Sequence, residues 1–128
     1  MQTTRPTRVF IVDDSVSIRS RLVQMLARME DVAVVGEAAS AIDAVAGILR
    51  ILPDSVLLDL NLMGSTGLDV MRKVRPQAPG VVFVVLTNHS EPQYRDACFE
   101  AGARYFLDKS RDLDKVAGVI AEIAATRH

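Results

Sequence analysis

The sequence has little cysteine and little net charge, and each shortage excludes a class of protein. The single cysteine, Cys98, has no partner for a disulfide within the chain, and it rules out a cluster of thiolate metal ligands. The formal net charge is only −1, from 15 basic and 16 acidic residues, so bulk charge gives no reason to expect nucleic-acid or membrane binding. Strong local charge must therefore come from where the acids are placed.

Long apolar runs are also missing. No run approaches the roughly 18 apolar residues that a membrane-spanning helix needs. The first eight residues lack the apolar core of a secretion signal. We therefore expect a cytoplasmic protein. Its length suits a single domain, residues 1–128, that buries a real core with Cys98 as a small member of it.

Short apolar segments alternate with helical patterns along the whole chain. The segments expected to be buried strands are 9–12, 32–35, 55–58, 81–86 and 104–107. Helices are expected from Ser15, from Ser40, over 68–74, from Ser90 to Gly102 and from Leu113 onwards. The apolar positions of the second helix are Ile42, Val45, Ala46 and Leu49. This alternation predicts an α/β fold, with a five-stranded parallel sheet covered by helices on both faces.

Polar residues follow four of the five predicted strands. They are Asp13 and Asp14 after the first, Asp59 after the third, Thr87 after the fourth and Lys109 after the fifth. Strand order 2-1-3-4-5 would gather them at one edge, where open α/β sheets bind ligands. Three carboxylates need a cation, and oxygen ligands suit Mg²⁺. Asp59 is flanked by all the others, which makes it the natural nucleophile for accepting a phosphoryl group.

Each of these residues alone also has a plainer interpretation. Asp13 and Asp14 could simply favour the start of the following helix through its dipole. Thr87 favours strands, and Lys109 could be a solvated surface charge. The ordered set is what makes a phosphoryl-transfer site the better hypothesis.

That set resembles the receiver domain of response regulators in two-component signalling, a flavodoxin-like or chemotaxis-regulator-like fold. The resemblance runs from about residue 8 to residue 125. It is carried by Asp13-Asp14, by Asp59 within Leu-Leu-Asp-Leu-Asn, by Gly67, by Thr87 and by Lys109. It implies a signalling switch that catalyses its own phosphorylation and dephosphorylation and is not a metabolic enzyme.

The resemblance also implies a metal site. Asp14 and Asp59 would bind Mg²⁺ (or Mn²⁺) directly, Asp13 would act largely through water, and the backbone carbonyl of Asn61 would be the remaining protein ligand. Asp59 would accept the phosphoryl group from a phosphohistidine on a sensor histidine kinase or a histidine phosphotransfer protein.

Three further residues receive roles from the resemblance. Thr87 and Lys109 would contact the phosphoryl oxygens. Phe106, three residues before the lysine, would be the switch aromatic, although strand alternation leaves Tyr105 as the alternative. The switch would remodel the face made by the fourth helix, fifth strand and fifth helix. That face would bind a downstream protein target or form a phosphorylation-dependent homodimer.

Four positions depart from the usual pattern of the family. Met63 stands where proline is frequent, and Asn88 follows the threonine where alanine or glycine is usual. His89 comes next, at a position that in the family influences the attacking water. These three would modulate the dephosphorylation rate. Ser110 replaces a proline that often follows a cis peptide. Because a cis bond before a non-proline residue costs about 2.5–4 kcal/mol, the geometry at Lys109-Ser110 stays open.

Several alternatives remain at this point. The chain could be an interaction module of the same fold that no longer cycles phosphate, although the intact acidic set argues against that. A phosphatase of the haloacid-dehalogenase type would need an Asp two residues after the nucleophile, where this chain has Asn61. We expect a single-domain regulator that acts through protein contacts, and the alternative is a receiver excised from a longer DNA-binding regulator.

Overall fold

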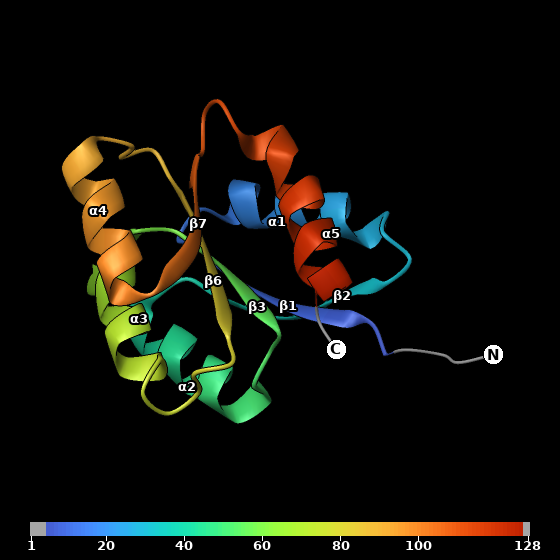
Figure 1. Cartoon of the computed structure of the whole chain (residues 1–128), viewed down its shortest axis with the longest axis horizontal. Coiled ribbons are helices and arrows are strands. Elements are labelled where there is room, and N and C mark those ends of the chain that lie inside the picture. The colour runs from blue at the N-terminus through green and yellow to red at the C-terminus, as the bar shows by residue number, and fades with distance from the viewer. Residues whose placement is uncertain (1–4, 127–128) are drawn as a thin grey trace.

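The computed structural model describes residues 5–126, so an expected frayed end at His128 lies outside the described residues. A five-stranded parallel sheet lies between two layers of helices (Figure 1). The strands of this sheet are β1 (Thr7–Val12), β2 (Val32–Ala38), β3 (Ser55–Leu58), β6 (Val82–Thr87) and β7 (Ala103–Asp108). The helices are α1 (Val16–Ala27), α2 (Ala41–Ile51), α3 (Gly67–Val74), α4 (Pro92–Ala101) and α5 (Val116–Thr126).

The strands follow the order β2-β1-β3-β6-β7, which confirms the predicted flavodoxin-like topology. Val12 lies opposite Leu58 on β3, and Leu58 lies opposite Val85 on β6. The carboxyl ends of the central strands therefore stop at nearly the same level. Whatever follows them in the sequence is delivered to one edge of the sheet.

Alternation along each strand divides the core between the two faces of the sheet. Phe10 and Val12 of β1 belong to the cluster under α2, α3 and α4, whereas Val9 and Ile11 belong to the cluster under α1 and α5. Figure 1 shows the same division, with α2, α3 and α4 on one side of the sheet and α1 and α5 on the other. Cys98 lies in the first cluster, fully buried as predicted, and burial raises the pKa of its thiol to about 11.

The helices begin at hydroxyl side chains that satisfy free backbone N–H groups. Ser15 accepts a hydrogen bond from the N–H of Ile18, and Ser40 caps α2 in the same way. The helix expected to start with Ser90 as its cap instead begins at Pro92, because the capping position is Glu91 and no side chain bonds there. The proline at the first helical position instead fixes the backbone in a conformation suited to starting the helix.

The buried face of α2 also differs from the prediction. The buried residues are Ala41, Ala44, Gly47 and Ile48, while Ile42 is 82% exposed and Ala46 is exposed too. The helix is apolar on nearly all sides, so its periodicity does not select a face. The ring of Phe10 does, because a Cβ on Gly47 would come within 2.7 Å of it.

Strand β2 was predicted to end at Val35 and instead runs to Ala38. Its pairing with β1 shifts between Val9 and Phe10, and the ladder then continues from Gly36 onwards. A Cβ on Gly36 would lie 2.5 Å from the Phe10 ring, so the absence of a side chain allows the strand to continue there. Within residues 5–126, no helix is both long enough and apolar enough to cross a membrane.

Two helical glycines provide a test of the Phe10 contact. Gly47→Ala should lower the free energy of unfolding by about 1–3 kcal/mol, because the new methyl group overpacks against a buried ring. Gly118→Ala in α5 meets no atom within 4 Å and should raise it by about 0.5–1 kcal/mol through helix propensity. Urea denaturation of both variants measures the difference. Equal shifts would contradict the proposed role of Phe10.

Candidate functional site

Asp59 follows the last residue of β3 and is held there by the backbone. Its N–H donates to the carbonyl of Val12 at 2.9 Å, which extends the ladder by one step. The four residues of β3 are all buried, and Asp59 itself is only 5% exposed. The sheet therefore fixes both the depth and the direction of this carboxylate.

Gly67 packs directly on the backbone of Asp59. A Cβ at Gly67 would lie 2.5 Å from the Asp59 carbonyl oxygen and 3.1 Å from the Cα of Leu60. The Gly67 N–H also donates to the carbonyl of Leu60 at 2.9 Å. A glycine eight residues after the aspartate thus allows α3 to begin against the strand end.

Three carboxylates meet at this edge. Asp13, Asp14 and Asp59 each present an oxygen atom, and these atoms lie within 4.8 Å of one another. Asp13 is 2% exposed, whereas Asp14 is exposed. Carboxylate oxygens in this number suit a hard divalent cation that keeps several of its waters. The three residues fit such an ion, and the cluster could hold one.

Lys109 supplies the counter-charge. Its ammonium group lies 2.7 Å from Asp13 Oδ2 and 3.0 Å from Asp59 Oδ2, and its side chain is 9% exposed. The N–H of Lys109 donates to the carbonyl of Thr87 at 2.8 Å, so the lysine starts from the end of the β6–β7 ladder. One ammonium group thus bridges two carboxylates that come from different strands.

The pKa values in this cluster reflect burial and mutual contact. Burial raises the pKa of Asp59 above its usual value, and the nearby ammonium of Lys109 only partly opposes this. Burial alone would lower the pKa of Lys109, but its contacts with Asp13 and Asp59 together raise it. The Lys109 ammonium therefore stays charged until the pH rises through that elevated pKa, whereas at the acid end its pair with Asp59 is lost as the pH falls through the raised pKa of that carboxyl.

Three of the predicted site residues lie at the end of β6 and in its connection to α4. Thr87 is completely buried, and its Oγ1 accepts a hydrogen bond from the N–H of His89 at 3.1 Å. Asn88 is exposed and lines the hollow above Asp59. The His89 ring instead lies against Tyr94, with 5.5 Å between the ring centroids. The rate-modulating roles of Asn88 and His89 stay predictions.

The loop after β3 contains a small hairpin that the sequence did not predict. Strand β4 (Asn61–Leu62) pairs antiparallel with β5 (Ser65–Thr66), and Gly64 turns the chain with φ 81°. Met63 at the tip is 64% exposed. The N–H of Asn61 faces Asp59 Oδ1 across 3.4 Å, so the hairpin begins in contact with the acidic cluster.

Tyr105 and Phe106 point to opposite faces of β7, as alternation predicts. Phe106 packs with the α2–α4 side of the core, and its ring lies 6.4 Å from that of Phe99 on α4. Tyr105 packs on the α5 side, where its hydroxyl donates to Glu122 at 2.9 Å. Of the two, Phe106 is the one that contacts α4. The bond between Lys109 and Ser110 is trans, because residues 5–126 contain no cis peptide.

A hollow of about 590 Å³ opens above the acidic cluster. Of the predicted residues it is lined by Asp14, Asp59, Asn61, Asn88 and Lys109. The remaining lining residues, which had no predicted role in the site, are Ser15, Ile18, Arg21, Ser110 and Leu113. These residues belong to the start of α1 and to the segment after β7. Only the tertiary structure shows that these two segments lie close together.

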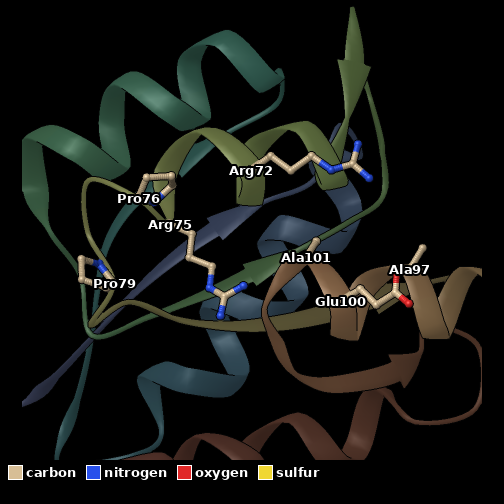
Figure 2. A pocket seen from close by; sticks show the side chains of 7 residues that line it. All are labelled: Arg72, Arg75, Pro76, Pro79, Ala97, Glu100 and Ala101. Atoms are coloured by element: carbon tan, nitrogen blue, oxygen red, sulfur yellow. The ribbon is translucent and has the colours of Figure 1, made fainter.

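A second hollow, of about 630 Å³, lies away from the acidic cluster, between α3 and α4 (Figure 2). Arg72 and Arg75 of the α3 side face Ala97, Glu100 and Ala101 of α4 across it. Arg75 packs on the αL residue that ends α4, since a Cβ on Gly102 would meet its side chain at 2.7 Å. A cation at a helix C-terminus is favourable, which accounts for this arginine structurally.

Comparison with known proteins shows the family to which this fold belongs. The model of the response regulator receiver domain matches residues 9–121. The chain belongs to this family. Receiver domains act in two-component signalling, and the matched segment includes the whole acidic cluster, Thr87 and Lys109.

Several relatives of this receiver domain are longer proteins. The response regulator GacA of Pseudomonas aeruginosa is 30% identical over 118 residues, covering 92% of this chain and 55% of that protein. A protein-glutamate methylesterase/protein-glutamine glutaminase of Rhizobium etli is 35% identical over 99 residues, covering 77% of this chain and 28% of that protein. The chain therefore spans about half or less of the curated relatives it matches.

Solved receiver structures are similar over nearly the full chain. The receiver domain of the putative response regulator NarL from Mycobacterium tuberculosis has a TM-score of 0.89 at 29% identity, covering 97% of this chain and all of that one. A LuxR-family two-component response regulator from Aurantimonas has a TM-score of 0.87 at 30% identity, covering 95% and 88%.

The contact between Gly67 and Asp59 leads to a test. Gly67→Ala should reduce the free energy of unfolding by about 1–3 kcal/mol, because the methyl group meets backbone atoms that cannot rotate away. It should also shift the backbone amide resonance of Asp59. Gly80→Ala is the control: nothing lies within 4 Å of its added Cβ, so its stability should change by less than about 0.5 kcal/mol. A Gly67→Ala variant matching this control would show that the close approach is unimportant.

Proposed function

We propose that this receiver domain accepts a phosphoryl group on Asp59, from a phosphohistidine of a sensor histidine kinase or a histidine phosphotransfer protein. The observation that carries the proposal is the Lys109 ammonium, 2.7 Å from Asp13 and 3.0 Å from Asp59, beside three clustered carboxylates. Carboxylates that served only to cap the following helix would not require a buried ammonium group that contacts two of them. Family membership supports the same chemistry.

The reaction would begin with attack by a carboxylate oxygen of Asp59 on phosphorus. The bond to the histidine nitrogen breaks, and its electron pair stays on the imidazole. Phosphoryl transfer requires mainly positioning and charge stabilisation, which this edge supplies. Mg²⁺, held by Asp13, Asp14, Asp59 and the carbonyl of Asn61, would neutralise charge on the phosphoryl oxygens.

The remaining site residues would act on the new phosphoryl oxygens. The Lys109 ammonium already contacts Asp59 Oδ2, so it is within reach of a group attached to that carboxylate. The Thr87 hydroxyl accepts from His89 and retains its own proton to donate. Asn88 lines the hollow through which water would approach, so it would influence hydrolysis, together with Met63 and His89.

The output would be a change of protein contacts. Phe106 lies between β7 and α4, where a shift of Thr87 could alter its packing. We propose a switch that catalyses only its own phosphorylation and hydrolysis and then binds a protein target or a second copy of itself. Two relatives found here carry additional sequence beyond the shared region, so a role inside a longer regulator is the alternative.

Phosphorylation by a small phosphodonor tests the function directly. Incubation with acetyl phosphate and Mg²⁺ should give one acid-stable, base-labile phosphoryl adduct, detected by intact-protein mass spectrometry. Asp59→Asn should abolish it, because the amide is not a nucleophile at this position. Asp69→Asn, in α3 and away from the cluster, is the matched control and should be phosphorylated normally. Absence of any adduct on the unaltered protein would defeat the proposal.

Metal binding is tested separately by stability. Mg²⁺ at ten times its dissociation constant should raise the free energy of unfolding by about 1.4 kcal/mol, since it binds only the folded cluster. Asp14→Asn should weaken this effect, and without metal it should stabilise the protein by removing one of three repelling carboxylates. Glu30→Gln, an exposed residue before β2, should change neither quantity. A Glu30→Gln response equal to that of Asp14→Asn would rule out the cluster as the binding site.

A further inference from the structure

The carboxylate of Asp108, immediately before Lys109, is nearly buried and closes the turn that follows β7. It is 9% exposed. Its Oδ1 atom accepts hydrogen bonds from the Ser110 N–H at 2.9 Å, the Ser110 hydroxyl at 2.6 Å and the Arg111 N–H at 3.2 Å. A single oxygen thus holds the two residues that come after the lysine.

The backbone of Asp108 is fixed as well, by a reciprocal contact with Asp112. The Asp108 N–H donates to Asp112 Oδ2 at 2.9 Å, and the Asp112 N–H donates to the Asp108 carbonyl at 2.7 Å. Lys115 lies 3.2 Å from the other oxygen of Asp112. The segment from Asp108 to Asp112 is therefore a closed turn with bonds at both of its ends.

Lys109 sits inside this turn, and its side chain leaves it toward the acidic cluster. Asp108 pairs with Thr87 across the sheet, and the Lys109 N–H donates to the Thr87 carbonyl. A lysine has a flexible four-carbon stem and rotating donors, so its ammonium group is placed accurately only if the backbone is. The turn supplies that constraint from the C-terminal side, and the ladder supplies it from the N-terminal side.

We propose that Asp108 is a positioning residue for phosphoryl transfer, whose carboxylate fixes the turn from which Lys109 reaches Asp59. The inference rests on the proposed function and names a residue that acts through Lys109. The hydroxyls of Ser110 and Ser90 hold the pKa of Asp108 well below its usual range, so the carboxylate stays charged. Ser90 belongs to the connection between β6 and α4, so the Asp108 carboxylate also faces that connection.

The first experiment compares variants in phosphorylation by acetyl phosphate. Asp108→Ala should slow the reaction about tenfold through misplacement of the lysine. Mg²⁺ affinity should not fall, because Asp108 is not a member of the acidic cluster and a displaced ammonium leaves less positive charge beside it. Asp108→Asn keeps an oxygen acceptor for Ser110 and should recover most of the rate. Asp114→Ala, an exposed acid in the following 3-10 turn, is the matched control and should react like the unaltered protein.

A double-mutant cycle separates positioning from a general structural effect. If Asp108 acts through the lysine, Asp108→Ala should cause no further loss in a Lys109→Ala background. An equal loss in both backgrounds, or a fall in Mg²⁺ affinity that accounts for the rate, would overturn the proposal. An unchanged rate for Asp108→Ala would overturn it too. Should Asp108→Ala fail to fold, Ser110→Ala, which removes the hydroxyl donor to Asp108, carries the same cycle.

A measurement without phosphate keeps this inference distinct from the proposed function. If the unaltered protein takes up no phosphoryl group, the proposed function fails and Asp108 loses its role in the reaction. If phosphorylation succeeds, NMR of the Lys109 ammonium group reports on positioning itself. Its protons should exchange with water several-fold faster in Asp108→Ala than in Asp114→Ala. Equal exchange in the two variants would overturn the assignment of Asp108 while leaving phosphorylation of Asp59 intact.

Discussion

The carboxylates of Asp13, Asp14 and Asp59 repel one another across no more than 4.8 Å, and the fold must hold them together against that repulsion. It does so by attaching each acid to the end of a buried strand, whose position is set by apolar packing on both faces of the sheet. Lys109 relieves only part of the repulsion. The remaining repulsion favours binding of a cation. The core residues that hold the strand ends in place maintain this repulsion without touching the site.

The way each strand end is anchored explains which parts of the site are rigid. The N–H groups of Asp13, Asp59 and Lys109 all donate to carbonyls of a neighbouring strand or its end. The hairpin at Met63 and the start of α4 have weaker support, with two-residue strands in one case and no side-chain cap in the other. A firmly anchored acidic cluster is thus bordered by two segments with fewer local hydrogen bonds, where local opening is expected to cost less.

Much of this arrangement was predictable because the relevant signals are local. Strands that are buried on both faces are continuous apolar runs, and a polar residue at the end of such a run identifies the edge of the sheet. The buried face of α2 was not predictable, since Ile42 and Ile48 are equally apolar and only the packing of the helix on the core distinguishes them. The hydrogen bonds of Asp108 were not predictable either, because beside Lys109 it resembles any strand-ending acid and its partners come from a turn without periodicity.

The backbone bonds of Asp13, Asp59 and Lys109 have a consequence for how the domain comes apart. Each bond extends the central ladder by one step, so it is supported by the buried strands behind it. The acidic cluster should therefore persist for as long as the hydrophobic core does. Partial unfolding would release the hairpin or α4 and leave the acids in place. A partly unfolded molecule would therefore keep its acidic cluster while losing the order of the neighbouring surfaces.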